Sequence, residues 1–207
     1  ALPGAHLLVF VNGRLEPGLC RTGRLQPGVV LGSLGYILEQ KPDGLDETLL
    51  LGNSTTPTTP SPFADLNLSF MADGAYIRLP PGTVIKAPIQ ILCIASEANL
   101  AIQPRHLVLA AADSSATLIE QHVATSETSY FTNTVTHIAL GPGASIEHYK
   151  LQQESPSAFH IAEIEVSQGA NSHFSSGSFA LGARLARTGI NVALRAEGAV
   201  CDLIGLY

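Results

Sequence analysis

Charged residues are scarce in this 207-residue sequence, at 14%, and its 11 lysines and arginines are outnumbered by 17 acidic residues. The formal net charge of -6 and the lack of any basic run argue against a nucleic-acid binder, because phosphate contacts need clustered lysine and arginine. No apolar run is long enough to cross a bilayer. Hydrophobic residues make up 45%, which is enough for the core of one large domain and excludes extensive disorder.

Cysteine is also rare, because Cys20, Cys93 and Cys201 are the three present and they lie far apart. An odd number at such spacing predicts free thiols in a reducing compartment and lacks the paired spacing of zinc or iron–sulfur ligands. The first residues, ALPGAHLLVFV, lack an initiator Met and the positive region of a signal peptide. We therefore expect a trimmed chain with a cytoplasmic location, or one inside an organelle.

Residues 1–62 have the texture of a short, irregular N-terminal region. Asn12 and Gly13, within LVFVNGRL, predict a tight hairpin turn. A short helix is expected to begin near Asp46. The Ser/Thr/Pro-rich segment NSTTPTTPSPF is expected to be a linker, because proline blocks strand pairing. The boundary placed here leaves residues 63–207 as the core.

The core region consists of short β-rich runs separated by Gly, Pro, Asn, Asp and Ser, without a sustained helical apolar stripe. Small residues follow turns at intervals of 26 to 29 residues, at Ala116, Ala144, Ala170 and Ala199. Such a period is typical of stacked repeats, in which neighbouring units bury a face that one unit alone cannot bury. The sequence therefore predicts an all-β solenoid, and a β-sandwich with regular hairpins is the alternative.

The histidines are candidate metal ligands, because sites in β folds combine two or three histidines with a carboxylate. Those near the repeat corners are His122, His148, His160 and His173. Counted from the small residue of each repeat, His122, His148 and His173 are six, four and three positions on, so they do not form one column. Alternation places His148 on the strand face of Ile146 and Lys150. We therefore predict scattered structural or surface histidines and no metal, cofactor or catalytic residue.

Motifs of catalysis are absent from the sequence, which has no Gly-x-Ser-x-Gly elbow and no Walker loop. Cys93, inside IQILCIA, is expected to be a core thiol. Glu163 and Glu165 share a strand face, as a solenoid enzyme acting on polysaccharide would require, but a solvated outer face explains them better. The prediction is a protein that is not an enzyme. A polysaccharide-active solenoid enzyme and a metal-binding β-barrel are the alternatives.

Several long segments occur in an order that is characteristic of one known family. They are LVFVNGRL, DLNLSFMADGA, FMADGAYIRLPPGTVIKAPIQIL, PRHLVLAAADSSATLIEQHV, FTNTVTHIALGPGASIEHYKLQQESPSAFHIA and AEGAVCDLIGLY. Over most of the chain they closely resemble the SufD branch of the SufB/SufD family. Members of this family are scaffold proteins of the SUF iron–sulfur cluster assembly machinery.

The resemblance implies a right-handed parallel β-helix that is not an enzyme and works with a sister scaffold, SufB, and the ATPase SufC. It also implies that the cluster forms at the boundary between the two scaffolds, with ligands that lie beyond Tyr207. The chain is thus expected to be truncated at its C-terminus and to carry no site residue of its own. Apolar side chains in its last strand predict a homodimer, or pairing with a SufB-like protein, through the C-terminal coil. These side chains are Val200, Leu203, Ile204 and Leu206.

Overall fold

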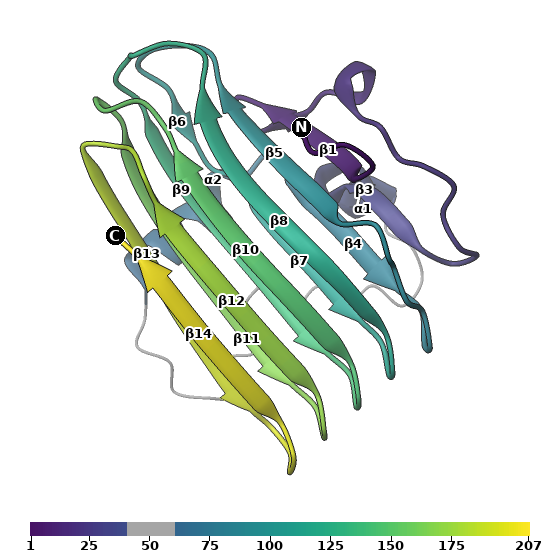
Figure 1. Ribbon diagram of the computed structural model, residues 1–207. Coiled ribbons are helices and arrows are strands. Elements are labelled where there is room, and N and C mark those ends of the chain that lie inside the picture. Colours follow the sequence, from purple (N-terminus) through teal and green to yellow (C-terminus); the bar gives the residue numbers. More distant parts are fainter. Residues whose placement is uncertain (41–60) are drawn as a thin grey trace.

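Two sheets form most of the computed structural model, which describes residues 1–40 and 61–207 (Figure 1). Sheet A contains, in spatial order, β14 (Val200–Leu206), β12 (His173–Ala180), β10 (Ser145–Gln153), β8 (Ser115–Ala124), β5 (Ile89–Ala95), β1 (His6–Val11) and β2 (Arg14–Leu15). Sheet B contains β13 (Leu185–Leu194), β11 (Phe159–Gln168), β9 (Phe131–Leu140), β7 (Arg105–Ala110), β4 (Ala75–Leu79) and β3 (Val30–Ser33), and β6 (Ala101–Ile102) pairs with β9.

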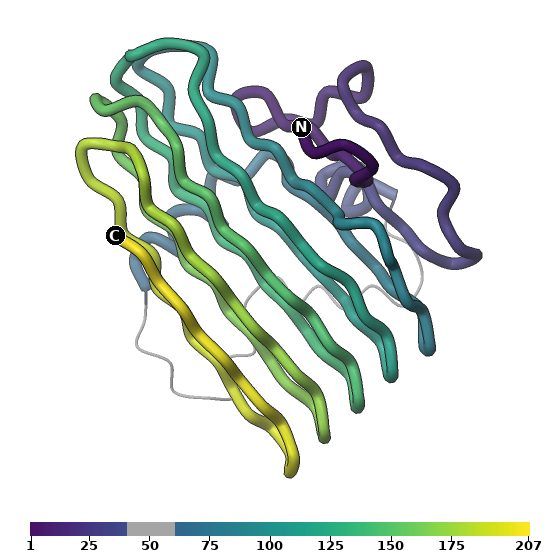
Figure 2. The backbone as a smooth tube through the Cα atoms, in the orientation of Figure 1, coloured from purple at the N-terminus to yellow at the C-terminus, as the bar shows by residue number. Residues whose placement is uncertain are grey.

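Strands make up 52% of the structure and wind into a parallel β-solenoid of about five turns. Successive turns stack so that equivalent strands run side by side along the molecule (Figure 2). The prediction of an all-β solenoid is therefore confirmed, and the sandwich alternative is wrong. None of the helices formed by the described residues is long and apolar enough to cross a membrane.

The register between neighbouring turns decides which side chains enter the solenoid. Ser115, Ser145 and His173 occupy equivalent positions on β8, β10 and β12. From these positions buried and more exposed residues alternate along β8 and β10, as a pleated strand requires. The prediction of a repeat of this length is right, but the small residues assigned to equivalent positions do not pair with one another in the sheet. Ala116 pairs with Ile146, two positions past Ala144, and this shift of two preserves the alternation.

The interior between the sheets changes character along each strand. One half is apolar, where side chains from both sheets pack into a single core with members that are at most 9% exposed. Examples are Phe10, Ile77, Leu118, Ile138 and Phe174. The other half, towards the C-terminal ends of β8 and β10, is polar. Burial of apolar surface therefore stabilises one half of the solenoid, and the polar half needs internal partners.

The N-terminal region joins the solenoid through β1, which pairs in parallel with β5. β1 and β2 form an antiparallel hairpin in which Asn12 and Gly13 have φ values of 49° and 82°. Both lie in the left-handed region that an Asn-Gly turn requires, so the predicted hairpin is confirmed. The helix expected near Asp46 lies outside the described residues. The division of the chain at residue 62 remains a prediction.

Within residues 1–40 and 61–207, two α-helices interrupt the strands, α1 (Leu34–Gln40) and α2 (Pro62–Phe70), besides a 3-10 turn at Pro17–Leu19. Sequence analysis did not predict α2, which extends into the region expected to hold strands alone. Ser61 caps it by accepting a hydrogen bond from the Ala64 amide at 3.3 Å, and Pro62 occupies its first turn. The main buried residue of α2 is polar, so the helix has no apolar stripe from which the sequence could predict it.

Asn67 is that residue, and it fixes α2 to β9 and to the segment before β7. Its side-chain amide donates to the carbonyl oxygens of Pro104 at 2.9 Å and Asn133 at 2.8 Å. Its oxygen accepts from the Arg105 guanidinium at 2.8 Å. With no exposed surface, Asn67 exchanges all of its hydrogen bonds with water for bonds to the protein.

Replacing Asn67 by leucine tests this attachment. The variant Asn67→Leu keeps a similar side-chain volume but leaves two buried carbonyls without this donor, so we expect a loss of about 3 kcal/mol in the free energy of unfolding. Urea denaturation measures it. The control Asn191→Leu changes an exposed residue of β13 and is expected to cost less than about 0.5 kcal/mol. Equal losses for both variants would contradict this role of Asn67.

Candidate functional site

Polar side chains from both sheets meet in one half of the solenoid interior. This interior polar cluster consists of Glu120 and His122 from β8, His148, Lys150 and Gln152 from β10, Glu154 from the corner after β10, Thr132 and Thr136 from β9, and His160 from β11. All of these residues are at most 5% exposed. Strand alternation directs the strand residues inward, because they occupy every second position. On β8 and β10 the apolar inward residues come before the polar ones, and on β9 and β11 they come after them.

Glu120 is the centre of one half of the cluster. Its Oε1 accepts from Lys150 Nζ at 2.7 Å and pairs with His122 Nε2 at 2.8 Å. Its Oε2 accepts from Thr136 Oγ1 at 2.8 Å and lies 3.4 Å from His148 Nε2. Burial alone would raise the pKa of Glu120, but Lys150 and the two histidines hold that pKa well below its usual range. Glu120 and Lys150 therefore form a fully buried ion pair.

Glu154 is the centre of the other half. Its Oε1 accepts from Thr132 Oγ1 at 2.7 Å, and its Oε2 accepts from Gln152 Nε2 at 3.1 Å. His160 Nδ1 lies 2.6 Å from the same Oε2, which is an ion-pair distance. The angle is not that of a hydrogen bond, so both ring nitrogens of fully buried His160 lack a hydrogen-bond partner among the described residues. Burial opposes ionisation of Glu154, but His160 and its other neighbours keep its pKa below the usual range.

Two histidines of the cluster, His122 and His160, are neutral near pH 7. Burial, followed by the charge of Lys150, lowers the pKa of His122 to about 3. The same two causes lower the pKa of His160. Because Lys150 is paired with Glu120, the charge of Glu154 is left without a cation of its own within the cluster.

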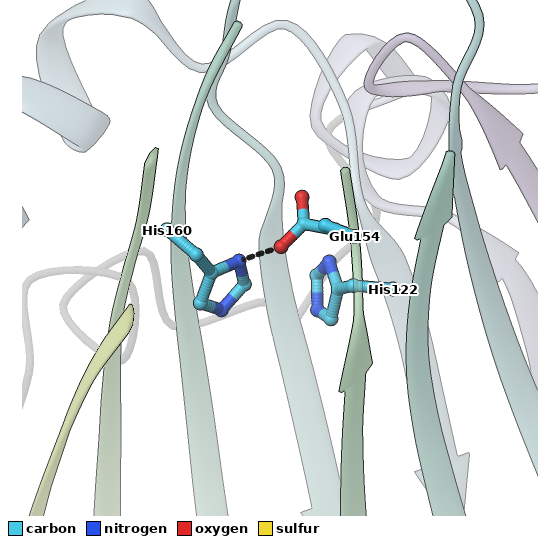
Figure 3. Close-up of side chains that lie close together, drawn as sticks. All are labelled: His122, Glu154 and His160. Carbon is cyan, nitrogen blue, oxygen red and sulfur yellow. Dashed lines mark ion pairs between the residues drawn. The ribbon is translucent and has the colours of Figure 1, made fainter. Parts of the chain in front are cut away.

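Three groups with metal-binding atoms converge beside Glu154. Donor atoms of His122, Glu154 and His160 lie within 4.8 Å of one another, and Figure 3 shows the carboxylate and the two rings pointing towards each other. Cys93 pairs with His122 in the strand register and, with Thr132, lines a small cavity beside this triad. It is a core thiol, as predicted, and burial raises its pKa. Two imidazoles and a carboxylate are a donor set that divalent metals use.

The prediction of scattered histidines is wrong. His122 and His148 do occupy different columns, because the register pairs His122 with Gln152. Their rings nevertheless converge on Glu120, from neighbouring turns of sheet A. The positions within a repeat compare strands of one sheet with each other. They do not predict contacts with side chains of the facing sheet or of a corner. Only His173 fits the description of a surface residue, with a side chain that is 48% exposed.

Glu163 and Glu165 lie on the outer face of sheet B, but that face is not simply solvated. Glu163 is 6% exposed and accepts from Ser61 Oγ at 3.0 Å. Glu165 Oε2 lies 3.2 Å from His137 Nδ1. Both carboxylates are held by local partners beside α2, and the argument for a polysaccharide-active enzyme loses its support.

Comparison with known proteins identifies the family of the chain. A family model described as the SUF system FeS cluster assembly, SufBD core domain matches residues 93–207. The chain belongs to the SufB/SufD family. A second model, the SufBD protein N-terminal region, matches residues 4–91. The predicted family is thereby confirmed.

A curated relative supports the same assignment. It is an iron–sulfur cluster assembly SufBD family protein from Synechocystis sp. (strain ATCC 27184 / PCC 6803 / Kazusa), and it is 30% identical over 217 residues. The match covers 99% of this chain and 47% of the relative. The chain therefore spans about half the length of this SufB/SufD protein.

Removing Lys150 tests the buried ion pair. In Lys150→Met, Glu120 stays buried without its ammonium partner, so we expect the free energy of unfolding to fall by about 3–5 kcal/mol. The double variant Glu120→Gln/Lys150→Met removes both charges and is expected to recover much of this loss. Urea denaturation of the two variants makes the comparison. A double variant that is less stable than Lys150→Met would contradict the pairing.

Stability is expected to fall as the pH is lowered from about 6.5 to about 4. His122 and His106 are neutral in the folded state down to a pKa of about 3 and about 4, whereas 6.5 is their unperturbed value. In this window the unfolded chain binds protons that the folded chain does not. Each histidine then lowers the free energy of unfolding by about 1.4 kcal/mol per pH unit.

Urea midpoints measured across this pH window check the effect. The control is His106→Asn, in which the amide oxygen replaces the Nδ1 acceptor of the Ala75 N–H group. It removes one titrating group, and we expect the slope to decrease by about 1.4 kcal/mol per pH unit. A slope that does not change in this variant would rule out His106 as a source.

Proposed function

We propose that this chain is the core of a SufD-like scaffold in an iron–sulfur cluster assembly complex, and that it does not act as an enzyme. The observation that carries the proposal is the pair of family models, which together match nearly the whole chain. The long ordered segments from LVFVNGRL to AEGAVCDLIGLY support the SufD branch within the family. A stacked solenoid suits a scaffold, because its turns form one extended, continuously hydrogen-bonded surface.

The partners in this proposal are a SufB-like scaffold and a SufC-like ATPase in the cytoplasm. We place the SufB-like partner at the turn formed by β13 and β14, the last strand of each sheet that the structure describes, which we call the β13–β14 edge. Apolar side chains of β14 accompany this edge, with Leu203 49%, Ile204 71% and Leu206 55% exposed. A second copy of the chain is the other occupant considered for the same edge.

Co-expression tests the partners. The tagged protein at its full length, so that any segment of its own that covers this edge is present, is produced together with the SufB-like and SufC-like proteins of its organism. We expect the three proteins to purify as one complex. The variant Leu203→Lys/Leu206→Lys is expected to weaken the complex at least about 10-fold, because it places two charges in an apolar interface.

The matched control is Leu19→Lys/Val84→Lys, which changes exposed apolar residues away from β13 and β14 and is expected to leave the complex intact. Light scattering gives the stoichiometry and separates a SufB-like partner from a second copy. Purification of the protein without either partner, under conditions where the SufB-like and SufC-like proteins are abundant, would refute the proposed complex. Equal weakening by the two double variants would refute the proposed edge.

A further inference from the structure

We propose that the solenoid interior binds one divalent first-row transition-metal ion through His122, Glu154 and His160. The three residues offer two imidazole nitrogens and one carboxylate oxygen, a set that Zn²⁺, Fe²⁺ and Co²⁺ accept. They come from β8, the corner after β10, and β11, so the folded solenoid is needed to bring them together. The site does not depend on the proposed partners, because it is built from side chains of this chain alone.

The first observation is that His160 makes no hydrogen bond of good geometry. Its side chain is fully buried, and neither Nδ1 nor Nε2 has a hydrogen-bond partner among the described residues. Leaving a buried polar group unpaired costs about 1–3 kcal/mol, so such groups call for a ligand, water or ion. Glu154 Oε2 lies 2.6 Å from Nδ1, but outside hydrogen-bond geometry. A cation bound by both Glu154 Oε2 and a His160 ring nitrogen would give both atoms a partner.

The second observation concerns charge. The Glu154 carboxylate is buried, while Lys150, the ammonium group of the cluster, is bound to Glu120 at 2.7 Å. A buried charge without a partner is strongly destabilising. A divalent cation supplies the missing positive charge.

The third observation is that two of the three ligands are held by groups behind them. His122 Nε2 lies 2.8 Å from Glu120 Oε1 and donates to it, which leaves the lone pair of its other nitrogen free for a metal. Thr132 Oγ1 donates to Glu154 Oε1 at 2.7 Å. Carboxylate–histidine and hydroxyl–carboxylate contacts of this kind fix ligand orientation in metalloproteins.

Space for an ion is present beside two of the ligands, His122 and Glu154. A small cavity lined by His122, Glu154, Thr132 and Cys93 offers about 10 Å³ to a water-sized sphere, which is about what one water or one ion needs. Two ligands of one tetrahedral zinc ion lie roughly 3.4 Å apart, given bond lengths near 2.1 Å. The present donors span up to 4.8 Å, so small side-chain rotations bring them to a common ion.

Titration with Co²⁺ tests the site, because this ion accepts zinc-type ligand sets and reports them by visible absorption. The full-length protein is first stripped of metal and then titrated, both as purified and after refolding in the presence of Co²⁺, so that access to the interior is not limiting. The site variants are Glu154→Gln and His160→Asn. The matched controls are Glu165→Gln and His137→Asn, which alter a carboxylate–imidazole pair on the outer face of sheet B.

We expect one Co²⁺ per chain, displaced by Zn²⁺. The site variants are expected to weaken binding about 100-fold or more, since loss of even an outer partner of a metal ligand costs about 10–100-fold. The controls are expected to bind as the unaltered protein does. A titration in which Co²⁺ and Zn²⁺ do not bind, before or after refolding, would overturn the proposal. So would equal affinities for Glu154→Gln and Glu165→Gln.

A second measurement covers variants that fail to fold. Binding to the folded state alone raises the urea midpoint of the unaltered protein in proportion to the logarithm of metal concentration. We expect this shift with Co²⁺ and with Zn²⁺, and no shift with Mg²⁺, which prefers all-oxygen sites. An unaltered protein with the same midpoint with and without Co²⁺ and Zn²⁺ would refute the site. That result would leave the proposed partner complex untouched, because co-purification measures the complex independently.

Discussion

The parallel register between successive turns is the constraint on which the other features depend. Because side chains alternate along a strand, a slip of one residue between β8 and β10 would turn every inward residue outward. Glu120 and Lys150 would then no longer both point into the interior, and the 2.7 Å contact between Glu120 Oε1 and Lys150 Nζ would be lost. The apolar half of the same strands secures the register, since Leu118 and Ile146 must remain in the core. Hydrophobic packing in one half thus positions the charges in the other.

A polar half inside a solenoid is costly in stability, which suggests that it is kept for a purpose other than folding. Replacing a buried ion pair by apolar residues of similar volume is often neutral or stabilising. An apolar interior would also avoid the unpaired nitrogens of His160. The proposed metal ion gives this arrangement a function that an apolar core lacks. The proposed metal site lies between the two sheets and is separate from the β13–β14 edge that we assign to the partner.

Local signals and periodicity predicted much of the architecture. The turn at Asn12 and Gly13 requires positive φ at both positions, which few other residues adopt. The regular spacing of turns predicts stacked repeats even when the register between the repeats is not known. Two classes of feature had no such signal. α2 is attached by one polar side chain, Asn67, rather than by an apolar stripe. The triad joins Glu154 at a corner with His122 on another turn, and only the closed solenoid makes them neighbours.

The attachment of α2 has a consequence for the order of events during synthesis on the ribosome. Asn67 bonds to carbonyls at Pro104 and Asn133, which lie 37 and 66 residues later in the chain. The helix therefore leaves the ribosome well before its docking surface exists. That surface is complete only when β7 and β9 have paired, and contacts of such long range form late. α2 therefore remains undocked while the solenoid grows. It docks only after β7 and β9 have paired and the first turns are complete.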